Sequence, residues 1–353
     1  MPTSRHHTIK DVARAARVST ATVSRVLNGS GKVRSSTAER VSAALDQLGY
    51  VPNAWAQAMA STDHNRLLGF VVPDIMNPFF AAIYVGINEY ARRHGFVVWM
   101  VDTSDDPVLE LEALDTLQRY RAQGIILTPT DPSANLAIVQ RMQSPVCLVD
   151  RRLSEDQWDL VLVDNLMGAR QATQLLIDVG HRDLAIIAGP QSSTPGHERL
   201  RGFMEAVNTS GIELPSEYIQ IGNFRQDSGF ALGHALLSLP HPPSAIFSCN
   251  NLMTMGLLQA VHATPGAVLG ETVAVVGFDD IPISNLTDPP LTVVSRPMKE
   301  MGEQAARLLL ARVDERDRPQ QTVVLSPQLI VQGSERIGRM LPPADRGDMA
   351  VAP

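Results

Sequence analysis

The chain has 353 residues, a formal net charge of −7 and 44% hydrophobic residues. This composition predicts a globular protein with room for more than one domain. No run reaches about eighteen apolar residues and the first residues lack a signal-peptide core, so we expect no membrane span, no secretion and a cytoplasmic location. Cys147 and Cys249 lie in predicted core strands, which indicates buried thiols in a reducing compartment and not a disulfide.

The first fifty residues have the pattern of three short helices. Thr8 and Ser19 stand where N-caps are expected, each just before an apolar series at helical spacing. The three series are Ile9, Val12, Ala13 and Ala16; then Val23, Val26 and Leu27; then Ala38, Val41, Ala44, Leu45 and Leu48, between Ser36 and Gly49. Two helices joined by a tight turn and completed by a third are typical of a helix-turn-helix, which enters the DNA major groove.

Charge is distributed unevenly along the chain. Residues 1–62 contain eight Lys and Arg residues and three Asp and Glu residues, a net charge of +5, so the remainder carries −12. An ordinary three-helix surface domain gives no reason for this asymmetry. A basic head on an acidic body indicates that the head alone meets phosphates, so we expect double-stranded DNA as a partner.

From residue 66 onward, apolar runs of strand length alternate with helical patterns. The predicted strands cover 67–73, 97–101, 124–127, 146–150, 184–189, 218–221, 245–249 and 273–278, and the predicted helices 79–94, 109–120, 198–210, 227–238 and 251–262. This alternation is typical of βαβ units and parallel sheets buried on both faces. Because the pattern restarts near residue 184, we predict two α/β subdomains with a cleft between them.

Residues 8–60 resemble the DNA-binding head of the lac/gal repressor family of bacterial transcription regulators. The motifs are Thr8-Ile9-Lys10-Asp11-Val12-Ala13, Val18-Ser19 through Leu27-Asn28, and Gly49-Tyr50-Val51-Pro52-Asn53. The resemblance extends to about residue 335. It implies a helix-turn-helix head (1–52), a hinge helix and linker (53–65), an effector-binding and dimerisation domain (66–335) and a tail, expected to be disordered (336–353).

The resemblance also implies the fold class. We expect an α/β protein with a small all-α head and a bilobed body, similar to ribose-binding proteins, of two doubly wound parallel sheets. Lobe one would comprise residues 66–163 and 297–322, and lobe two residues 164–296 and 323–335. Three chain crossings would join the lobes.

By the same resemblance, the head supplies the DNA contacts. Thr20, Ala21 and Arg25 match base-reading positions, and Arg is suited to bidentate contact with guanine. Met59 matches the hinge residue that wedges into the minor groove, where Leu is usual. The full predicted set is Thr8, Ser19, Thr20, Ala21, Thr22, Arg25, Asn28, Lys32, Asn53 and Met59, of which Ser19, Thr22, Asn28 and Lys32 are expected at phosphates.

The body offers a candidate ligand site. Open α/β sheets bind ligands at the carboxyl ends of their strands, and polar or aromatic residues follow most of the predicted strands, Asp74 and Asp102 among them. The resemblance places Asn77, Phe79, Phe80, Asp150, Arg151, Arg199, Phe224, Asn250, Asp279 and Arg296 at effector-binding positions. Carboxylates, amides, arginines and aromatic faces together suit a sugar.

Arg296 departs from the family pattern, in which an amide, usually Gln, is common at its position. Two interpretations remain open. The extra cation could read a carboxylate or phosphate of an anionic effector, such as a sugar acid or sugar phosphate. Alternatively, Asp150, Asp279 or another acid of the cleft neutralises it.

These observations predict a repressor of carbohydrate-utilisation genes that a sugar or sugar derivative releases from a pseudo-palindromic operator. A homodimer is expected because the tail lacks the leucine heptad of family tetramers. A corepressor-activated repressor that binds a nucleobase or another metabolite is the alternative, and a sugar-binding protein without a DNA function is a further one. Because no nucleophile–base pair, cofactor motif or metal-ligand spacing occurs, we expect no enzyme activity, cofactor or metal.

Overall fold

The computed structural model describes residues 7–27, 33–50, 66–280 and 284–338. Four predicted DNA contacts (Asn28, Lys32, Asn53 and Met59), the hinge and linker at 53–65, and the tail from 339 onward lie outside the described residues. The chain divides into two units, residues 1–66 and 67–353, which we describe separately. Among the described residues, no helix has the length and hydropathy needed to span a membrane.

The head contains the three predicted helices, α1 (Ile9–Ala16), α2 (Thr20–Leu27) and α3 (Ser35–Leu48). The backbone N–H of Thr8 donates to Asp11 Oδ2 (2.9 Å), and the N–H of Thr22 donates to Ser19 Oγ (3.1 Å), so both predicted caps are confirmed. Gly49 ends α3 in the left-handed conformation, with φ of 55°. The fully buried side chains of Val12, Val23 and Val41, one from each helix, form the centre of the core.

The first lobe of the body is a six-stranded parallel sheet with the order β11-β5-β4-β3-β1-β2. Its strands are β1 (Leu67–Val72), β2 (Val97–Asp102), β3 (Gly124–Leu127), β4 (Val146–Val149), β5 (Asp159–Val163) and β11 (Thr322–Leu325), and its helices are α5 (Pro78–Arg93), α6 (Pro107–Arg119), α7 (Leu136–Arg141) and α12 (Met298–Asp314). Side chains alternate along β1: Phe70 packs towards α5 and α12, whereas Val71 packs towards α6 and α7. The sheet is therefore buried on both faces, as predicted.

The second lobe repeats this plan with the strand order β12-β10-β9-β8-β6-β7. Its strands are β6 (Leu184–Ala188), β7 (Ile219–Ile221), β8 (Ala245–Ser248), β9 (Ala274–Phe278), β10 (Thr292–Ser295) and β12 (Gln328–Ile330), and its helices are α8 (Asn165–Asp178), α9 (Thr194–Thr209), α10 (Gln226–Leu237), α11 (Asn251–Ala263) and the short η1 (Ser216–Tyr218) and η2 (Ser284–Leu286). The β10–β12 pair is antiparallel, which departs from the predicted all-parallel sheet. An antiparallel edge strand on a parallel sheet is common in such folds.

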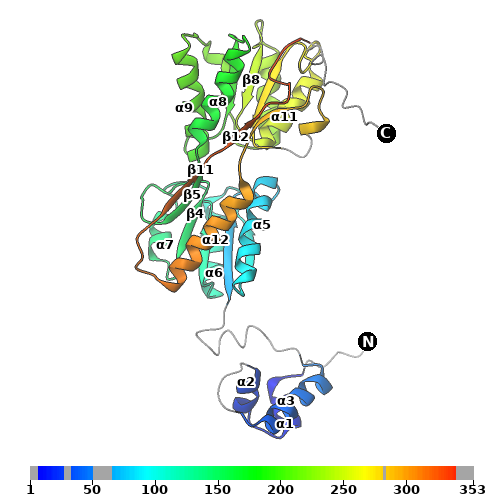
Figure 1. Ribbon diagram of the computed structural model, residues 1–353, viewed down its shortest axis with the longest axis vertical. Coiled ribbons are helices and arrows are strands. Elements are labelled where there is room, and N and C mark those ends of the chain that lie inside the picture. Colours follow the sequence, from blue (N-terminus) through cyan, green and yellow to red (C-terminus); the bar gives the residue numbers. More distant parts are fainter. Residues whose placement is uncertain (1–6, 28–32, 51–65, 281–283, 339–353) are drawn as a thin grey trace, which may run out of the picture. The chain divides into compact units, whose positions relative to one another are not determined.

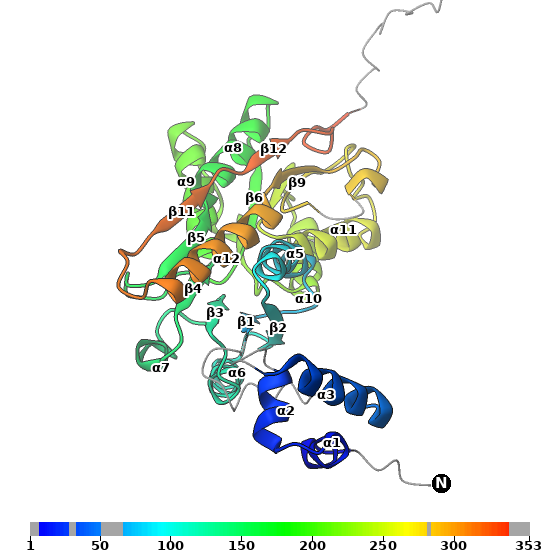
Figure 2. The same ribbon diagram turned by 60° about the horizontal axis from the view of Figure 1, so that its bottom comes forward.

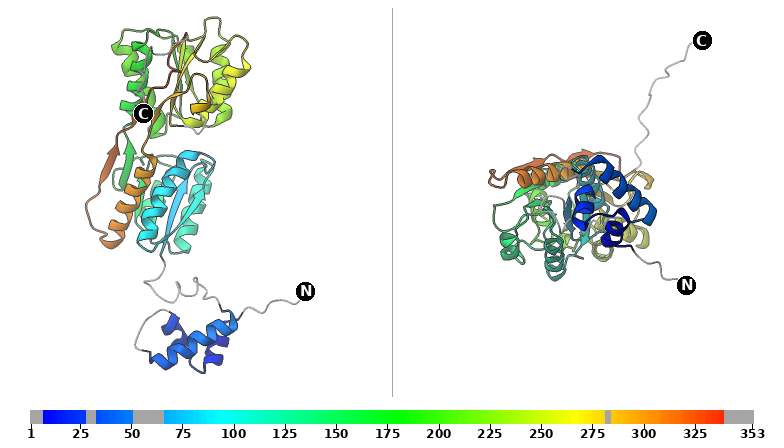
Figure 3. Two further views of the ribbon diagram at one scale, coloured as in Figure 1. Left: turned by 45° about the vertical axis from the view of Figure 1, so that its right-hand side comes forward. Right: turned by 90° about the horizontal axis from the view of Figure 1, so that it is seen from below.

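The chain crosses between the lobes after β5, between β10 and α12, and between β11 and β12 (Figure 1). As expected, residues 297–320 return to lobe one, where α12 lies beside α5 (Figure 2). The approximate boundary expected near residue 322 falls inside β11. This strand pairs with β5 through Leu325, so the last crossing follows Leu325. Figure 3 shows the chain from another side, with this crossing in the orange to red part of the ribbon.

Two glycines permit the close approach of α5 and α12. A Cβ atom on Gly86 would lie 2.0 Å from the carbonyl oxygen of Lys299, and one on Gly302 would lie 2.0 Å from that of Ile83. These obstacles are backbone atoms, so the two helices would have to separate to admit a side chain. The packing of lobe one therefore depends on the absence of side chains at this contact.

We predict that Gly302→Ala lowers the free energy of unfolding by about 2 kcal/mol, because the added methyl group forces the helices apart. Urea denaturation followed by circular dichroism measures the change. Arg307→Ala, at an exposed position of the same helix, is the matched control and should have a much smaller effect. Equal stability of Gly302→Ala and the unsubstituted protein would contradict this account of the helix contact.

Candidate functional site

The carboxyl ends of the strands of both lobes line one pocket. It contains all ten residues predicted from the sequence to meet an effector, together with Pro73, Asp74, Asp105, Pro195, Asn223 and Arg225. Asp102, the other strand-end acid, is not among its lining residues. Its Oδ1 accepts from the N–H of Ile75 (2.8 Å) and its Oδ2 from Ser104 Oγ (2.9 Å), so it stabilises a turn. Because residues of both lobes line the pocket, it is a cleft between the lobes.

Three residues that line the cleft have a left-handed backbone conformation. Asp150, Phe224 and Asp279 have positive φ values of 68°, 65° and 74°. Asp150 follows β4 and Asp279 follows β9 directly, so each strand ends in a left-handed residue. This conformation costs a non-glycine residue on the order of 1–3 kcal/mol and persists only where surrounding contacts impose it. Such positions cluster at binding sites, which agrees with their place in the cleft.

Two cleft amides are also helix caps. Asn77 Oδ1 accepts from the N–H of Phe79 (3.0 Å) at the start of α5, and Asn250 Oδ1 accepts from the N–H of Met253 (2.9 Å) at the start of α11. Asn77 Oδ1 also accepts from Asn251 Nδ2 of the other lobe (2.8 Å). These contacts fix both amides, so they have a structural role whether or not they meet a ligand.

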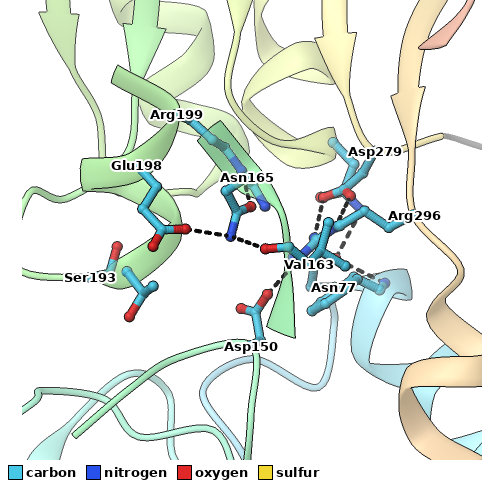
Figure 4. Close-up of polar contacts among 12 residues, drawn as sticks. Asn77, Asp150, Val163, Asn165, Ser193, Glu198, Arg199, Asp279 and Arg296 are labelled. Atoms are coloured by element: carbon cyan, nitrogen blue, oxygen red, sulfur yellow. Dashed lines mark hydrogen bonds and ion pairs between the residues drawn. The ribbon is translucent and has the colours of Figure 1, made fainter. Parts of the chain in front are cut away.

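Arg296 lies between two carboxylates (Figure 4). Its Nη1 donates to Asp150 Oδ1 (2.6 Å), and its Nη2 and Nε both donate to Asp279, the former over 2.6 Å. Burial, the largest single effect, lowers the pKa of Arg296, but the charges of Asp279 and Asp150 and their hydrogen bonds together outweigh it, so the pKa is raised. Of the two interpretations left open by the sequence, the structure therefore favours neutralisation of Arg296 by these acids.

Arg199 is the second buried cation of the cleft, with 1% of its surface exposed. Its Nε donates to Asn165 Oδ1 (2.9 Å) and its Nη1 to the carbonyl of Cys249 (2.5 Å). Burial, reinforced by the charge of Arg296, lowers its pKa to about 10, so it stays protonated near neutral pH. Nη2 is buried without a hydrogen-bond partner in the described chain, which leaves a donor for a ligand acceptor.

Arg151 is held mainly by its own lobe. Its Nη1 donates to Asp105 Oδ1 (2.8 Å) and, more weakly, to the carbonyls of Pro129 and Thr130 (3.2 and 3.3 Å). The buried carboxylate of Glu110 braces the same loop by accepting from the N–H of Thr130 (2.7 Å). Sequence reasoning missed Asp105 and Glu110, because neither directly follows a predicted strand and only the fold brings them to Arg151.

In the described part of the head, the predicted DNA contacts are exposed except for the half-buried Thr22. Thr20, Ala21 and Arg25 on α2 are exposed, whereas Val23 of the same helix is fully buried. Ser19 is exposed, and its Oγ lies 2.9 Å from Thr22 Oγ1. The second helix therefore has one face in the core and one free face of short polar side chains and an arginine.

Comparison with known proteins identifies the chain. Residues 8–53 match the bacterial regulatory proteins of the lacI family, and residues 65–332 match the periplasmic binding proteins and sugar binding domain of the LacI family. The chain belongs to the LacI family. It is accordingly a DNA-binding transcriptional repressor with a sugar-binding type of effector domain, and a role in carbohydrate regulation fits its relatives.

Three relatives of this LacI-family chain span nearly all of it. The ribose operon repressor of Escherichia coli (strain K12) is 33% identical over 93% of this chain and 99% of its own length. The structure of a transcriptional regulator CelR-cellobiose complex is 33% identical, with a TM-score of 0.71 over 93% of this chain and 99% of the other. The lac repressor dimer bound to operator is 26% identical, with a TM-score of 0.79 over 94% and 100%. The two repressors among them are regulators of transcription, not enzymes.

We predict that Asp279→Asn lowers the free energy of unfolding of the body by about 3 kcal/mol, because it removes one partner of a buried ion pair. Urea denaturation measures the loss. Asp156→Asn, which breaks the exposed pair with Arg152 (3.5 Å), should change stability little. If both substitutions had equally small effects, the cluster around Arg296 would not contribute to stability as described.

Proposed function

We propose that this repressor holds a pseudo-palindromic operator as a homodimer and releases it when a small sugar or sugar derivative binds in the cleft. The observation that carries the proposal is the convergence of the predicted effector residues in one pocket that contains a buried, unpartnered donor, Arg199 Nη2. The relationship to the ribose operon repressor and to a regulator in complex with cellobiose adds support.

The two lobes provide the means of control. Around the cleft, Arg225 Nη2 of lobe two donates to the carbonyl of Ser104 in lobe one (3.0 Å), and the N–H of Arg152 donates to Thr194 Oγ1 (2.9 Å). A ligand that meets groups of both lobes favours one arrangement of the lobes over another. Its effect on operator binding equals its difference in affinity for the two states.

In the head, we propose that α2 reads the operator. Thr20 and Ala21 are too short for more than a methyl contact and one hydroxyl hydrogen bond, so Arg25 supplies the strong base contact. The remaining predicted contacts, including those of the hinge, position the protein on the DNA backbone or widen the minor groove.

Two substitutions separate the two functions. We predict that Arg25→Ala weakens specific operator binding by about 1–3 kcal/mol per half-site, because a bidentate base contact is lost. Arg199→Ala should leave operator binding intact and abolish the effector response. Gel shifts on the DNA upstream of the protein's own gene, with and without sugars and nucleobases, measure both effects.

The same gel shifts also judge the alternatives. Stronger DNA binding in the presence of a nucleobase would replace release by corepression. Absence of a specific shift would reject the repressor function on this DNA and favour a sugar-binding protein alone. Unchanged operator affinity of Arg25→Ala would show that Arg25 does not read a base.

Homodimerisation has a candidate surface in lobe one. Strand β2 is the edge of its sheet, and the side chains of Val97 (61%) and Trp99 (37%) are exposed along it. Apolar side chains on an unpaired edge strand are normally covered by another element or another chain. We propose that a second copy of the chain covers this edge.

Val97→Glu is predicted to convert the dimer to a monomer, because it places a charge in the apolar contact. Light scattering measures the mass. Val324→Glu, at a similarly exposed position of β11 on the opposite edge of the sheet, is the matched control and should leave the dimer intact. A tetrameric unsubstituted protein, or a dimer that survives Val97→Glu alone, would contradict the proposed assembly.

A further inference from the structure

The cleft contains a cation that is not available to a ligand. Arg296 directs three donors at two aspartates, and the side chains of Arg296, Asp150 and Asp279 are 3%, 7% and 2% exposed. The guanidinium also lies over the ring of Phe79, 3.6 Å from its centroid. Both acids and the aromatic ring therefore hold Arg296 in place. Turning its side chain towards a ligand would leave two buried carboxylates without this ion-pair partner.

Arg296 sets the charge balance of the buried part of the site. Arg199 and Arg296 are balanced there by Asp150 and Asp279, and Arg151 is balanced by Asp105 over 2.8 Å. Asp74 and Arg225, the remaining charged lining residues, are of opposite sign and lie at more exposed positions. The lining of the cleft is therefore neutral in total before any ligand binds.

The groups left for a ligand suit hydroxyls. Arg199 Nη2 and Arg151 Nε are buried donors without a partner in the described chain. The ion pair with Arg296 engages Oδ1 of Asp150 but not Oδ2. A hydroxyl group can accept from such a donor and donate to this oxygen without adding charge. A carboxylate or phosphate in the same place would leave uncompensated negative charge beside two buried aspartates, and an ammonium group would leave uncompensated positive charge.

We infer that Arg296 is a specificity-determining residue: as the built-in counter-ion of Asp150 and Asp279, it restricts the effector to uncharged polyhydroxyl compounds. The inference rests on the proposed function, because it assumes that the effector occupies this cleft. An amide at position 296 would leave Asp150 and Asp279 opposite Arg199 alone, so the buried part of the site would be one unit more negative. The residue that departs from the family pattern thus selects against charged sugar derivatives instead of recognising them.

Isothermal titration of the full-length protein with matched sugars tests the inference. The panel is D-glucose, D-glucuronate and D-glucosamine; D-galactose, D-galacturonate and D-galactosamine; and D-ribose, D-ribonate and D-ribose 5-phosphate. We expect a neutral sugar to bind at least roughly tenfold more tightly than its charged counterparts, because each charged group would be buried without a partner.

Substitutions at position 296 test whether Arg296 causes the selectivity for neutral sugars. Arg296→Gln should shift the ratio of affinities for amino sugar and neutral sugar by roughly tenfold towards the amino sugar, because the cleft becomes net negative. Arg296→Lys keeps the charge and should keep the selectivity while weakening overall affinity. Arg312→Gln removes a similar buried pair, with Asp159 (2.6 Å), inside lobe one, and controls for lost stability because it should not alter selectivity.

The outcomes are distinguishable. Tighter binding of an acid or phosphate than of its neutral partner would overturn the inference and leave the proposed function standing. Equal selectivity of Arg296→Gln and the unsubstituted protein would overturn it as well. Absence of binding across the whole panel would reject the monosaccharide effector of the proposed function and the inference with it.

Discussion

The body of this repressor depends on one buried ion cluster. Arg296 emerges from the crossing between β10 and α12 and joins an aspartate that ends a strand of lobe one to an aspartate that ends a strand of lobe two. Removal of three charges from water is costly, and only close pairing makes it tolerable. Asp150 and Asp279 belong to different lobes. The pairing of their charges with Arg296 therefore depends on the relative position of the lobes at the cleft.

Around this cluster, each lobe behaves as a tightly packed block. The α5–α12 contact excludes side chains at Gly86 and Gly302, and both faces of each sheet are covered by helices. Adjustments within a lobe of such density are costly in free energy, whereas a change between lobes acts on the crossings, the ion cluster of Arg296 and polar contacts such as that of Arg225 with Ser104. A ligand in the cleft can therefore act through the arrangement of the two lobes.

The three helices of the head depend on helix caps and a small apolar core. Thr8 and Ser19 cap the first two helices, and a small core of valines and alanines packs all three together. The exposed face of α2 is then free to carry Thr20, Ala21 and Arg25. Since two of these side chains are short, the proposed function assigns the strong base contact to Arg25.

The sequence by itself predicted the helices of the head, most of the alternation of strands and helices, and ten of the residues that line the cleft. Caps and apolar spacing act over a few neighbouring residues, and a strand end is visible wherever an apolar run meets a polar side chain. Strands β5, β10, β11 and β12 and helices α7, α8 and α12 were not among the predicted elements. Those at the sheet edges are short and partly exposed, and their pairing with distant strands defines them more than their own pattern does.

The tertiary structure alone decided the role of Arg296. Its charge was evident from the sequence, but two interpretations fitted equally while its neighbours were unknown. Asp150 and Asp279 lie far apart in the chain, and only the folding of both lobes brings them to one guanidinium. Pairing between buried charges depends on distances of a few ångströms, which no spacing along the sequence encodes.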